Sequence, residues 1–178
     1  MTDILIHPGA AAPAGDAPLT IRSARPADAA GCARIEAACF PPEQAASQGD
    51  IEKRIAAYPG HLLLAICQEE VVGYIMGPVI REPYIQDDMF ADTGCHDPNG
   101  PWQAVFSLAV IPPLQRRGIG GQLIHAMIAL ARREGRRGIT LTCLPDKVGY
   151  YASFGFEDRG IGQSVHGGAA WHNMVLPL

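Results

Sequence analysis

The segment from residue 105 to residue 133 constrains the fold of this chain more than any other. Its apolar first part, 105–110, predicts a buried strand, and 122–133 has the period of an amphipathic helix. Between them lies a basic turn, Gln115-Arg116-Arg117-Gly118-Ile119-Gly120-Gly121. A helix N-terminus presents unpaired backbone N–H groups and a positive dipole end, and the two arginines add charge. The segment therefore predicts an anion site for a phosphate or pyrophosphate.

Composition favours a single compact domain and argues against several kinds of partner. The chain has 178 residues, of which 48% are hydrophobic, enough for one core. Its net charge of -4 is unlike that of most nucleic-acid binders, which are basic. No apolar run approaches the roughly 20 residues that span a bilayer, so we expect no membrane partner. Five cysteines without paired spacing indicate reduced thiols and a cytoplasmic location, and the lack of CxxC or HExxH predicts no metal.

The pattern along the chain predicts one mixed α/β domain over residues 19–178, after a flexible N-terminal arm over 1–18. The arm is rich in Ala, Pro and Gly and has no basic leader, so we do not expect a signal peptide. A long polar loop over 81–101 is of a length that is usually functional or mobile. Helices are expected at 27–40, 43–57, 121–134 and 146–153, and strands at 19–22, 61–67, 71–80, 103–111, 139–143, 154–158 and 169–176.

Spacing within the turn excludes two common phosphate loops. A Walker loop needs Gly-x-x-x-x-Gly-Lys followed by Ser or Thr, and this chain has neither the lysine nor the hydroxyl. A dinucleotide fingerprint needs Gly-x-Gly-x-x-Gly and an acidic residue about 20 residues further on. Gly118-Ile119-Gly120-Gly121 does not match that spacing, and no acidic residue ends the strand at Cys143.

Two linked motifs resemble the GNAT acetyltransferase superfamily. Gln115-x-x-Gly118-x-Gly120 after Leu108-Ala109-Val110 resembles its acyl-CoA pyrophosphate loop, where glycines let the backbone approach the ligand. Downstream, Tyr151-Ala152-Ser153-Phe154-Gly155-Phe156 resembles its Tyr-x-x-x-Gly-Phe signature. The likeness covers about residues 19–176. It implies a single-domain α/β fold with about seven mostly antiparallel strands, splayed around the fourth and flanked by helices. It also implies acetyl-CoA as co-substrate.

Other segments are similar to the arylalkylamine (serotonin-type) branch of that superfamily. The first helix region, with Ile35-Glu36-Ala37-Ala38-Cys39-Phe40, and the strand Val72-Gly73-Tyr74-Ile75-Met76-Gly77 both resemble that branch, as does the long loop before Ser107. The implied activity is N-acetylation of a primary amine on a small molecule, with an aromatic amine as one candidate acceptor. The enzyme would be a monomer or a homodimer.

The resemblance implies roles for specific residues. Tyr151 would be the general acid that protonates the departing thiolate, and Ser107 lies on the strand beside the reaction. Backbone groups of Leu108 and Val110 would pair with the pantetheine arm, and an N–H near Leu108 or Ala109 would polarise the thioester carbonyl. The implied cofactor-binding residues are Leu108, Ala109, Val110, Gln115, Arg116, Arg117, Gly118, Ile119, Gly120, Gly121 and Tyr151.

The chain departs from the arylalkylamine pattern at the proton relay. That branch places two histidines on the fourth strand, and the matching positions here are Ala104 and Phe106. Ser107 is a poor base alone, and Cys143 and Tyr150 favour packing roles. The other candidate bases are better explained as surface charges or structural histidines; they are Glu82, Asp87, Asp88, His96, His166 and His172. The base therefore stays open.

The acceptor is less constrained than the donor. Segments around 40–43, the 81–101 loop and the C-terminal hairpin would surround it, with Glu43 or Asp87 holding a protonated amine. Aromatic walls could come from Phe40, Tyr84, Phe90, Trp102 and Phe106. Two alternatives remain: an acetyltransferase acting on protein or peptide amines, and a sensor that binds acyl-CoA without turnover.

Overall fold

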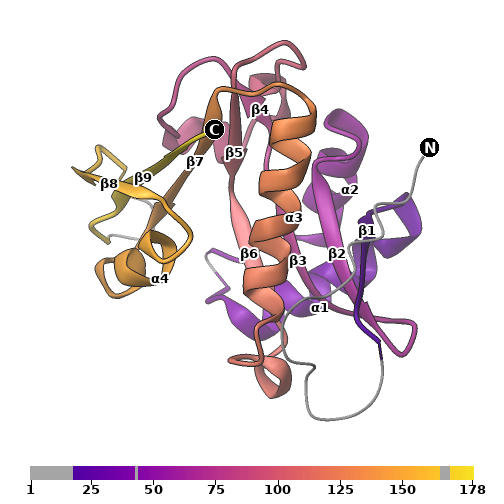
Figure 1. Cartoon of the computed structure of the whole chain (residues 1–178). Coiled ribbons are helices and arrows are strands. Elements are labelled where there is room, and N and C mark those ends of the chain that lie inside the picture. Colours follow the sequence, from indigo (N-terminus) through magenta and orange to yellow (C-terminus); the bar gives the residue numbers. More distant parts are fainter. Residues whose placement is uncertain (1–17, 43, 165–168) are drawn as a thin grey trace. The chain divides into compact units, whose positions relative to one another are not determined.

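The computed structural model describes residues 18–42, 44–164 and 169–178. The chain forms two units, and each holds one β-sheet (Figure 1). The first unit comprises the described residues up to Met76 together with Ser107–Met127, and the second comprises Gly77–Phe106 and Ile128–Leu178. The expected N-terminal arm lies outside the described residues, apart from Pro18.

The first unit is built on a four-stranded antiparallel sheet. Its strands are β1 (Thr20–Ser23), β2 (Leu62–Cys67), β3 (Glu70–Met76) and β6 (Ser107–Val110), in the order β1-β2-β3-β6. The β2–β3 hairpin turns at Gln68 and Glu69, one residue earlier than the sequence suggests. Both have positive φ, 51° and 66°, as a tight two-residue turn requires.

Two helices of the first unit pack against one face of this sheet. They are α1 (Ala29–Cys39), preceded by a 3-10 turn η1 (Pro26–Asp28), and α2 (Gln48–Ala57). Ile35 and Ile51 join Tyr74 and Met76 in one buried cluster. The expected helix from residue 43 begins only at Gln48, because the Ser47 hydroxyl accepts from the Asp50 N–H at 3.2 Å and caps it there.

The helix after the basic turn, α3 (Ile119–Arg133), begins two residues earlier than predicted. Within the first unit, Leu123 is fully buried and lies against β3. A Cβ added to Gly73 would come within 3.4 Å of the Leu123 Cδ1 atom. Gly73 and Tyr74 alternate along β3, so Leu123 lies on the face opposite α1 and α2. Both faces of β3 are therefore covered.

The second unit is a five-stranded mixed sheet. Its order is β4-β5-β7-β9-β8, and only the β5–β7 pair is parallel. These strands are β4 (Val79–Ile80), β5 (Trp102–Val105), β7 (Gly138–Cys143), β8 (Glu157–Ile161) and β9 (His172–Pro177). A short helix, α4 (Val148–Ala152), follows the 3-10 turn η5 (Pro145–Lys147). The 81–101 loop contains two more 3-10 turns, η2 (Asp87–Phe90) and η3 (Thr93–Cys95).

Two predicted strands are each divided between the sheets. The expected strand 103–111 becomes β5 and β6, separated by Phe106, and the expected strand 71–80 becomes β3 and β4. The second break lies at Gly77-Pro78, where a Cβ on residue 77 would be 2.1 Å from the Ala104 carbonyl oxygen and proline lacks an N–H. The seven expected strands thus become nine within the described residues. The mixed α/β class is confirmed.

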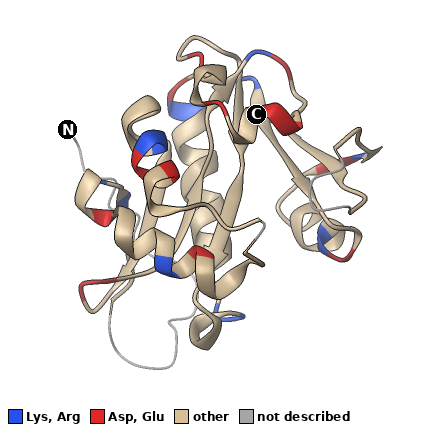
Figure 2. Ribbon diagram, turned by 180° about the vertical axis from the view of Figure 1, so that it is seen from behind, with Lys and Arg blue, Asp and Glu red and all other residues tan. Residues whose placement is uncertain are grey.

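Charge is distributed in short segments. Figure 2 shows basic segments that are separated along the chain by uncharged or acidic ones.

Across the described ranges, every helix is too short or too polar to cross a bilayer.

Candidate active site

The pairing of β6 with β3 determines which backbone groups of β6 point outward. The Ile111 N–H donates to the Val72 carbonyl at 2.9 Å, and the register places Val110 opposite Gly73. In an antiparallel pair, the backbone groups of successive residues point alternately toward the partner strand and away from it. The N–H and C=O groups of Leu108 and Val110 therefore point away from β3. The corresponding groups of Ala109 face β3 instead. Because β6 is the edge strand of its sheet, an extended ligand could add along it.

One of these outward groups already has partners. The Val110 carbonyl accepts from the Cys39 Sγ at 3.2 Å and from the Gln115 Nε2 at 2.9 Å. The N–H and C=O of Leu108 and the N–H of Val110 remain as the outward-facing groups. Of the two predicted donors to a thioester carbonyl, Leu108 therefore has the suitable orientation and Ala109 does not. Gln115 also holds the beginning of the turn against the end of β6.

The turn presents its backbone at the N-terminus of α3. After a 3-10 turn, η4 (Pro112–Leu114), Arg116 and Gly118 adopt positive φ angles of 60° and 82°. The Gln122 N–H donates to the Gly118 carbonyl at 3.0 Å, so Gly118 precedes the first helical residue. Ile119 is buried and anchors the helix, whereas Arg116 and Arg117 are exposed. The N–H groups of the first turn have no acceptor within the helix, which is the arrangement that binds anions.

A buried polar cluster lies beneath the beginning of β6. The Glu36 side chain is 2% exposed, and its Oε1 accepts hydrogen bonds from the Tyr74 hydroxyl and from the Ser107 Oγ, the latter at 3.1 Å. The Ser107 Oγ and the Tyr74 hydroxyl are 2.9 Å apart. The second oxygen of Glu36 accepts from the Ala46 N–H at 3.1 Å. Of this cluster, sequence reasoning identified only Ser107.

A sequence signal for Glu36 does exist. Cys32, Ile35 and Glu36 lie at i, i+3 and i+4 on α1, so all three share its buried face. Burial, the Glu36 charge and its hydrogen bond together raise the pKa of Tyr74 well above its usual value, with burial the largest cause. Burial also raises the pKa of the Cys32 thiol to about 12. Tyr74 and Cys32 are therefore protonated at neutral pH, and the Tyr74 hydroxyl donates a hydrogen bond to Glu36.

Tyr151 lies in the last turn of α4, in the second unit. Its carbonyl accepts from the N–H groups of Phe154 at 3.0 Å and Phe156 at 3.3 Å, a closure that Gly155 permits with φ of 92°. The Phe156 side chain is 4% exposed and its ring centroid lies 5.9 Å from that of Tyr151. Tyr150, expected to be the packing residue, is instead 41% exposed, and Tyr151 is the more buried of the two.

The surroundings of Tyr151 keep its hydroxyl protonated. Burial, and after it the charges of Cys143 and Tyr150, raises the pKa of Tyr151 far above its usual value. No group in the described ranges forms a hydrogen bond with this hydroxyl. Burial raises the pKa of Cys143 to about 11, which fits the structural thiol predicted from the sequence. The Tyr151 hydroxyl is therefore protonated at neutral pH.

The long loop and the β8–β9 connection line a pocket within the second unit. Its volume is about 710 Å³, in the usual range for small-molecule sites. Asp87 lies in its wall and accepts from the Ser164 Oγ at 2.5 Å. Tyr84 and Ile161 contribute apolar surface that is 50% and 69% exposed. The lining residues are Tyr84, Ile85, Gln86, Asp87, Asp88, Ile161, Gly162, Gln163, Ser164 and Asn173.

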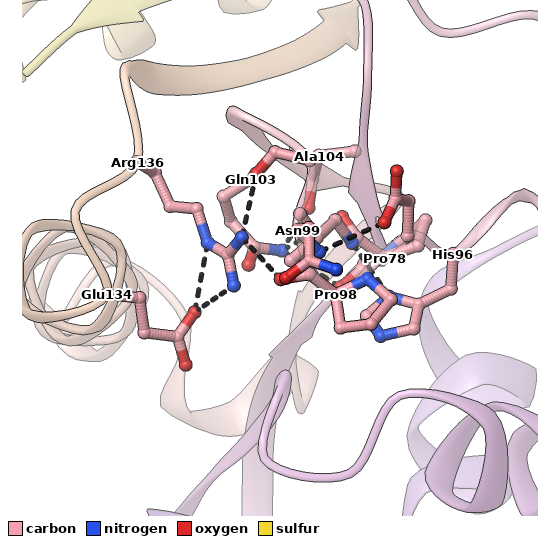
Figure 3. A network of polar contacts seen from close by, with 12 residues as sticks. Pro78, His96, Pro98, Asn99, Gln103, Ala104, Glu134 and Arg136 are labelled. Carbon is pink, nitrogen blue, oxygen red and sulfur yellow. Dashed lines mark hydrogen bonds and ion pairs between the residues drawn. The ribbon is translucent and has the colours of Figure 1, made fainter.

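The far end of the same loop is fixed by a network centred on Arg136 and Gln103 (Figure 3). Arg136 forms an ion pair with Glu134 at 2.8 Å and donates to the carbonyls of Pro98 and Gly100 at 2.8 and 2.7 Å. Gln103 is fully buried and donates to the carbonyls at positions 77, 78 and 104. The loop is therefore anchored at its C-terminal end.

Several candidate bases have structural roles. The His96 Nδ1 accepts from the Val79 N–H at 3.1 Å, and the His172 Nδ1 lies 2.9 Å from the Asp158 carboxylate, as a structural histidine would. Glu82 and Asp88 are exposed. His166 and Glu43 lie outside the described residues.

The two positions that hold histidines in the arylalkylamine branch are apolar here. Ala104 is fully buried, and the Phe106 ring packs 4.6 Å from that of Phe90. The first unit therefore brings together Ser107, 108–110 and 115–121. Tyr151 and the pocket belong to the second unit.

Three solved structures are similar to this chain over most of its length. In a structure of the GNAT-like decarboxylase GphF with isobutyryl-CoA, 21% of residues are identical and the TM-score is 0.78, over 88% of this chain and 98% of that one. A GNAT family acetyltransferase from Brucella melitensis with acetyl-CoA is 28% identical, with a TM-score of 0.60 over 90% of this chain and 88% of that one. The ribosomal-protein-S18-alanine N-acetyltransferase from Escherichia coli is 18% identical, with a TM-score of 0.61 over 89% and 93%.

Two of these structures hold an acyl-CoA, in agreement with the acetyl-CoA co-substrate that the family resemblance implied. No curated protein matches the chain. The sequence profile of the acetyltransferase (GNAT) family matches residues 27–156, a span that includes α1, the β6 edge, the basic turn and the Tyr151 motif. The chain therefore belongs to the acetyltransferase (GNAT) family.

Proposed function

We propose that residues 19–178 form an N-acetyltransferase that moves the acetyl group of acetyl-CoA directly to a primary amine of a small molecule. The observation that carries this proposal is the outward-facing backbone of Leu108 and Val110, followed within one unit by the basic turn at Gln115–Gly121. An extended pantetheine arm can pair along β6 while the pyrophosphate lies on the N–H groups at the beginning of α3.

In this mechanism the Leu108 N–H polarises the thioester. It would donate to the carbonyl oxygen and stabilise the negative charge that develops when the amine nitrogen attacks. Arg116 and Arg117 contribute charge-assisted contacts to the pyrophosphate. Gly118 lets the backbone approach without a side chain in the way.

Tyr151 is the proposed general acid. When the tetrahedral intermediate collapses, the C–S bond breaks and the departing thiolate takes the Tyr151 proton. The Tyr151 phenol is protonated at neutral pH, as a general acid must be before it acts, and burial raises its pKa further. A thiolate is more easily released when it is protonated as it leaves.

The pocket lined by the 81–101 loop is the proposed acceptor site. Tyr84 and Ile161 offer exposed apolar surface, and Asp87 offers a carboxylate for an ammonium group. This combination fits a hydrophobic or aromatic primary amine, as in the arylalkylamine branch. None of the five cysteines, all of them within the described residues, takes part in a disulfide, which fits the predicted cytoplasmic location.

A screen of amines with acetyl-CoA, read as released thiol, tests the proposal. Arylalkylamines should be acetylated faster than polyamines or peptide N-termini. Turnover confined to peptides would favour the protein-acetylating alternative, and turnover confined to polyamines would exclude the arylalkylamine preference. Acetyl-CoA binding without turnover on any amine would favour the sensor alternative.

A further inference from the structure

We propose that Glu36 is the proton acceptor of this enzyme, and that it receives the proton of the attacking amine through the Ser107 hydroxyl. This inference rests on the proposed function, and it assigns the base that Ala104 and Phe106 cannot supply. All of its parts lie in the first unit, on α1, β3 and the first residue of β6.

The geometry consists of three oxygens in mutual contact. The Tyr74 hydroxyl donates to the Glu36 Oε1, the Ser107 Oγ lies 3.1 Å from that same oxygen, and the Ser107 Oγ and the Tyr74 hydroxyl are 2.9 Å apart. Glu36 and Tyr74 are buried, whereas Ser107 is only partly buried. Ser107 is therefore the member of the cluster that a ligand can reach.

A count of hydrogens shows that the cluster can take one more proton. With Glu36 ionised, Tyr74 and Ser107 supply two hydrogens for three oxygen–oxygen contacts. Protonation of Glu36 supplies the third, so that each contact can contain one hydrogen. The Ala46 N–H, which donates to the other carboxylate oxygen, keeps the side chain in place in both states.

Ser107 is well placed along the chain to pass that proton. It immediately precedes Leu108, whose outward N–H is the proposed oxyanion donor. The ammonium of the acceptor gives a proton to the Ser107 Oγ while the Ser107 hydrogen moves to Glu36, which leaves the neutral amine to attack. The nitrogen loses its second proton as the amide forms, and the thiolate takes the Tyr151 proton as the C–S bond breaks. One of the two nitrogen protons then restores the Tyr151 hydroxyl and the other returns to solvent, so that each turnover releases one proton.

Other titratable groups near the cluster keep their protons during this step. Cys32 and Cys39 of α1 and Tyr74 of β3 all have raised pKa values, with burial as the largest cause in each case. Glu36 is thus the one carboxylate in this group of side chains and the natural place for the transferred proton.

The test compares Glu36→Gln with the wild type, using the amine that the wild type acetylates fastest. Glu36→Gln keeps one side-chain oxygen and the size of the residue but cannot take up the proton. We expect kcat to fall about 100-fold, the usual contribution of a general base. The acetyl-CoA Kd should stay within twofold. The kcat/KM of the variant should keep rising with pH instead of reaching the wild-type plateau, because solvent must now deprotonate the amine.

Glu52→Gln on α2 is the matched control, since it makes the same change at an exposed carboxylate. Glu36→Asp should restore part of kcat, because a carboxylate is present again. If Glu36→Gln does not fold, Ser107→Ala should show the same change of pH profile with acetyl-CoA affinity retained.

The two proposals fail in different ways. A wild-type pH profile and kcat in Glu36→Gln, alongside an active wild type, would overturn the Glu36 assignment alone. If Glu36→Gln does not fold, a wild-type pH profile and kcat in Ser107→Ala would overturn the assignment in the same way. A wild type that acetylates no amine would overturn the proposed function and this inference with it.

Discussion

The Gln115 side chain donates a hydrogen bond of 2.9 Å to the Val110 carbonyl, and so ties the basic turn to the last residue of β6. The hydrogen bond thereby fixes the position of the anion turn relative to the edge of β6, the two predicted halves of the donor site. Gln115→Ala removes this bond, which is worth about 1 kcal/mol. We expect the acetyl-CoA Kd in calorimetry to rise about fivefold. Gln48→Ala, which removes an exposed amide on α2, should leave the Kd unchanged; equal effects would argue against a positioning role.

A glycine is favoured at position 118 because φ there is 82°, in the left-handed region. Lack of space is not the reason, since a Cβ on residue 118 would meet nothing within 4 Å. Gly118→Ala should therefore lower the free energy of unfolding by about 1 kcal/mol through left-handed strain alone. Gly149→Ala is a matched control, because that glycine lies in α4 with open space around it. It should raise the free energy of unfolding by about 0.5 kcal/mol. Urea titrations of both variants check the signs, and a neutral Gly118→Ala would contradict the strain argument.

Arg116 and Arg117 are exposed on the turn, where they are proposed to contact the pyrophosphate. Replacing both with alanine should raise the acetyl-CoA Kd by at least 10-fold and flatten its dependence on salt, because two charge-assisted contacts are lost. Arg132 and Arg133, exposed in the last turn of α3, provide a control pair with the same change of charge. A similar loss of affinity in the control would mean that net charge, and not the turn, attracts the ligand.

The ion pair between Asp28 and Arg22 predicts a pH dependence of stability. The two Arg22 nitrogens lie 2.7 and 2.8 Å from the Asp28 oxygens, and this pairing is the main cause that lowers the pKa of Asp28. Because the folded pKa lies below the unfolded value of about 3.9, the stabilisation is present above that pH. It is lost as the pH falls through the folded pKa.

Asp28→Asn should therefore lower the free energy of unfolding by about 1 kcal/mol at pH 7, a modest value because the pair is partly exposed to solvent. The difference from wild type should shrink in denaturation experiments as the pH falls below 4. A difference that stays constant down to pH 2 would show that the charge of Asp28 is not its source.

The local structure of the basic turn and of α3 was predictable because it depends on short-range patterns. The helix α3 follows the turn as its period predicts, and Gly118, expected to be needed for close approach of the backbone, has a positive φ. The divided strands were not predictable in the same way. Ser107 is the only polar residue between Ala104 and Val110, so periodicity does not show that β5 and β6 pair in different sheets. Only Gly77-Pro78 carried a local signal of a break.

Glu36 was missed for a different reason. A carboxylate on the buried face of α1 becomes informative only when its partners are known, and Tyr74 and Ser107 are 38 and 71 residues away along the chain. Such long-range pairing follows from the order β3-β6 in the sheet, which single-sequence patterns do not give. The roles of Tyr150 and Tyr151 were equally hard to separate, because neighbouring residues in a short helix differ only in the direction they face.

The most direct test of the account is the kinetic effect of Tyr151→Phe, measured as thiol release from acetyl-CoA with the preferred amine. The variant keeps the ring that packs against Phe156 but loses the hydroxyl, so the fold and the acetyl-CoA Kd should be unchanged. We predict that kcat falls at least 100-fold, the usual contribution of a general acid. Unchanged turnover in Tyr151→Phe would contradict the proposed mechanism, and a wild-type protein whose melting temperature does not respond to coenzyme A would contradict the donor site itself.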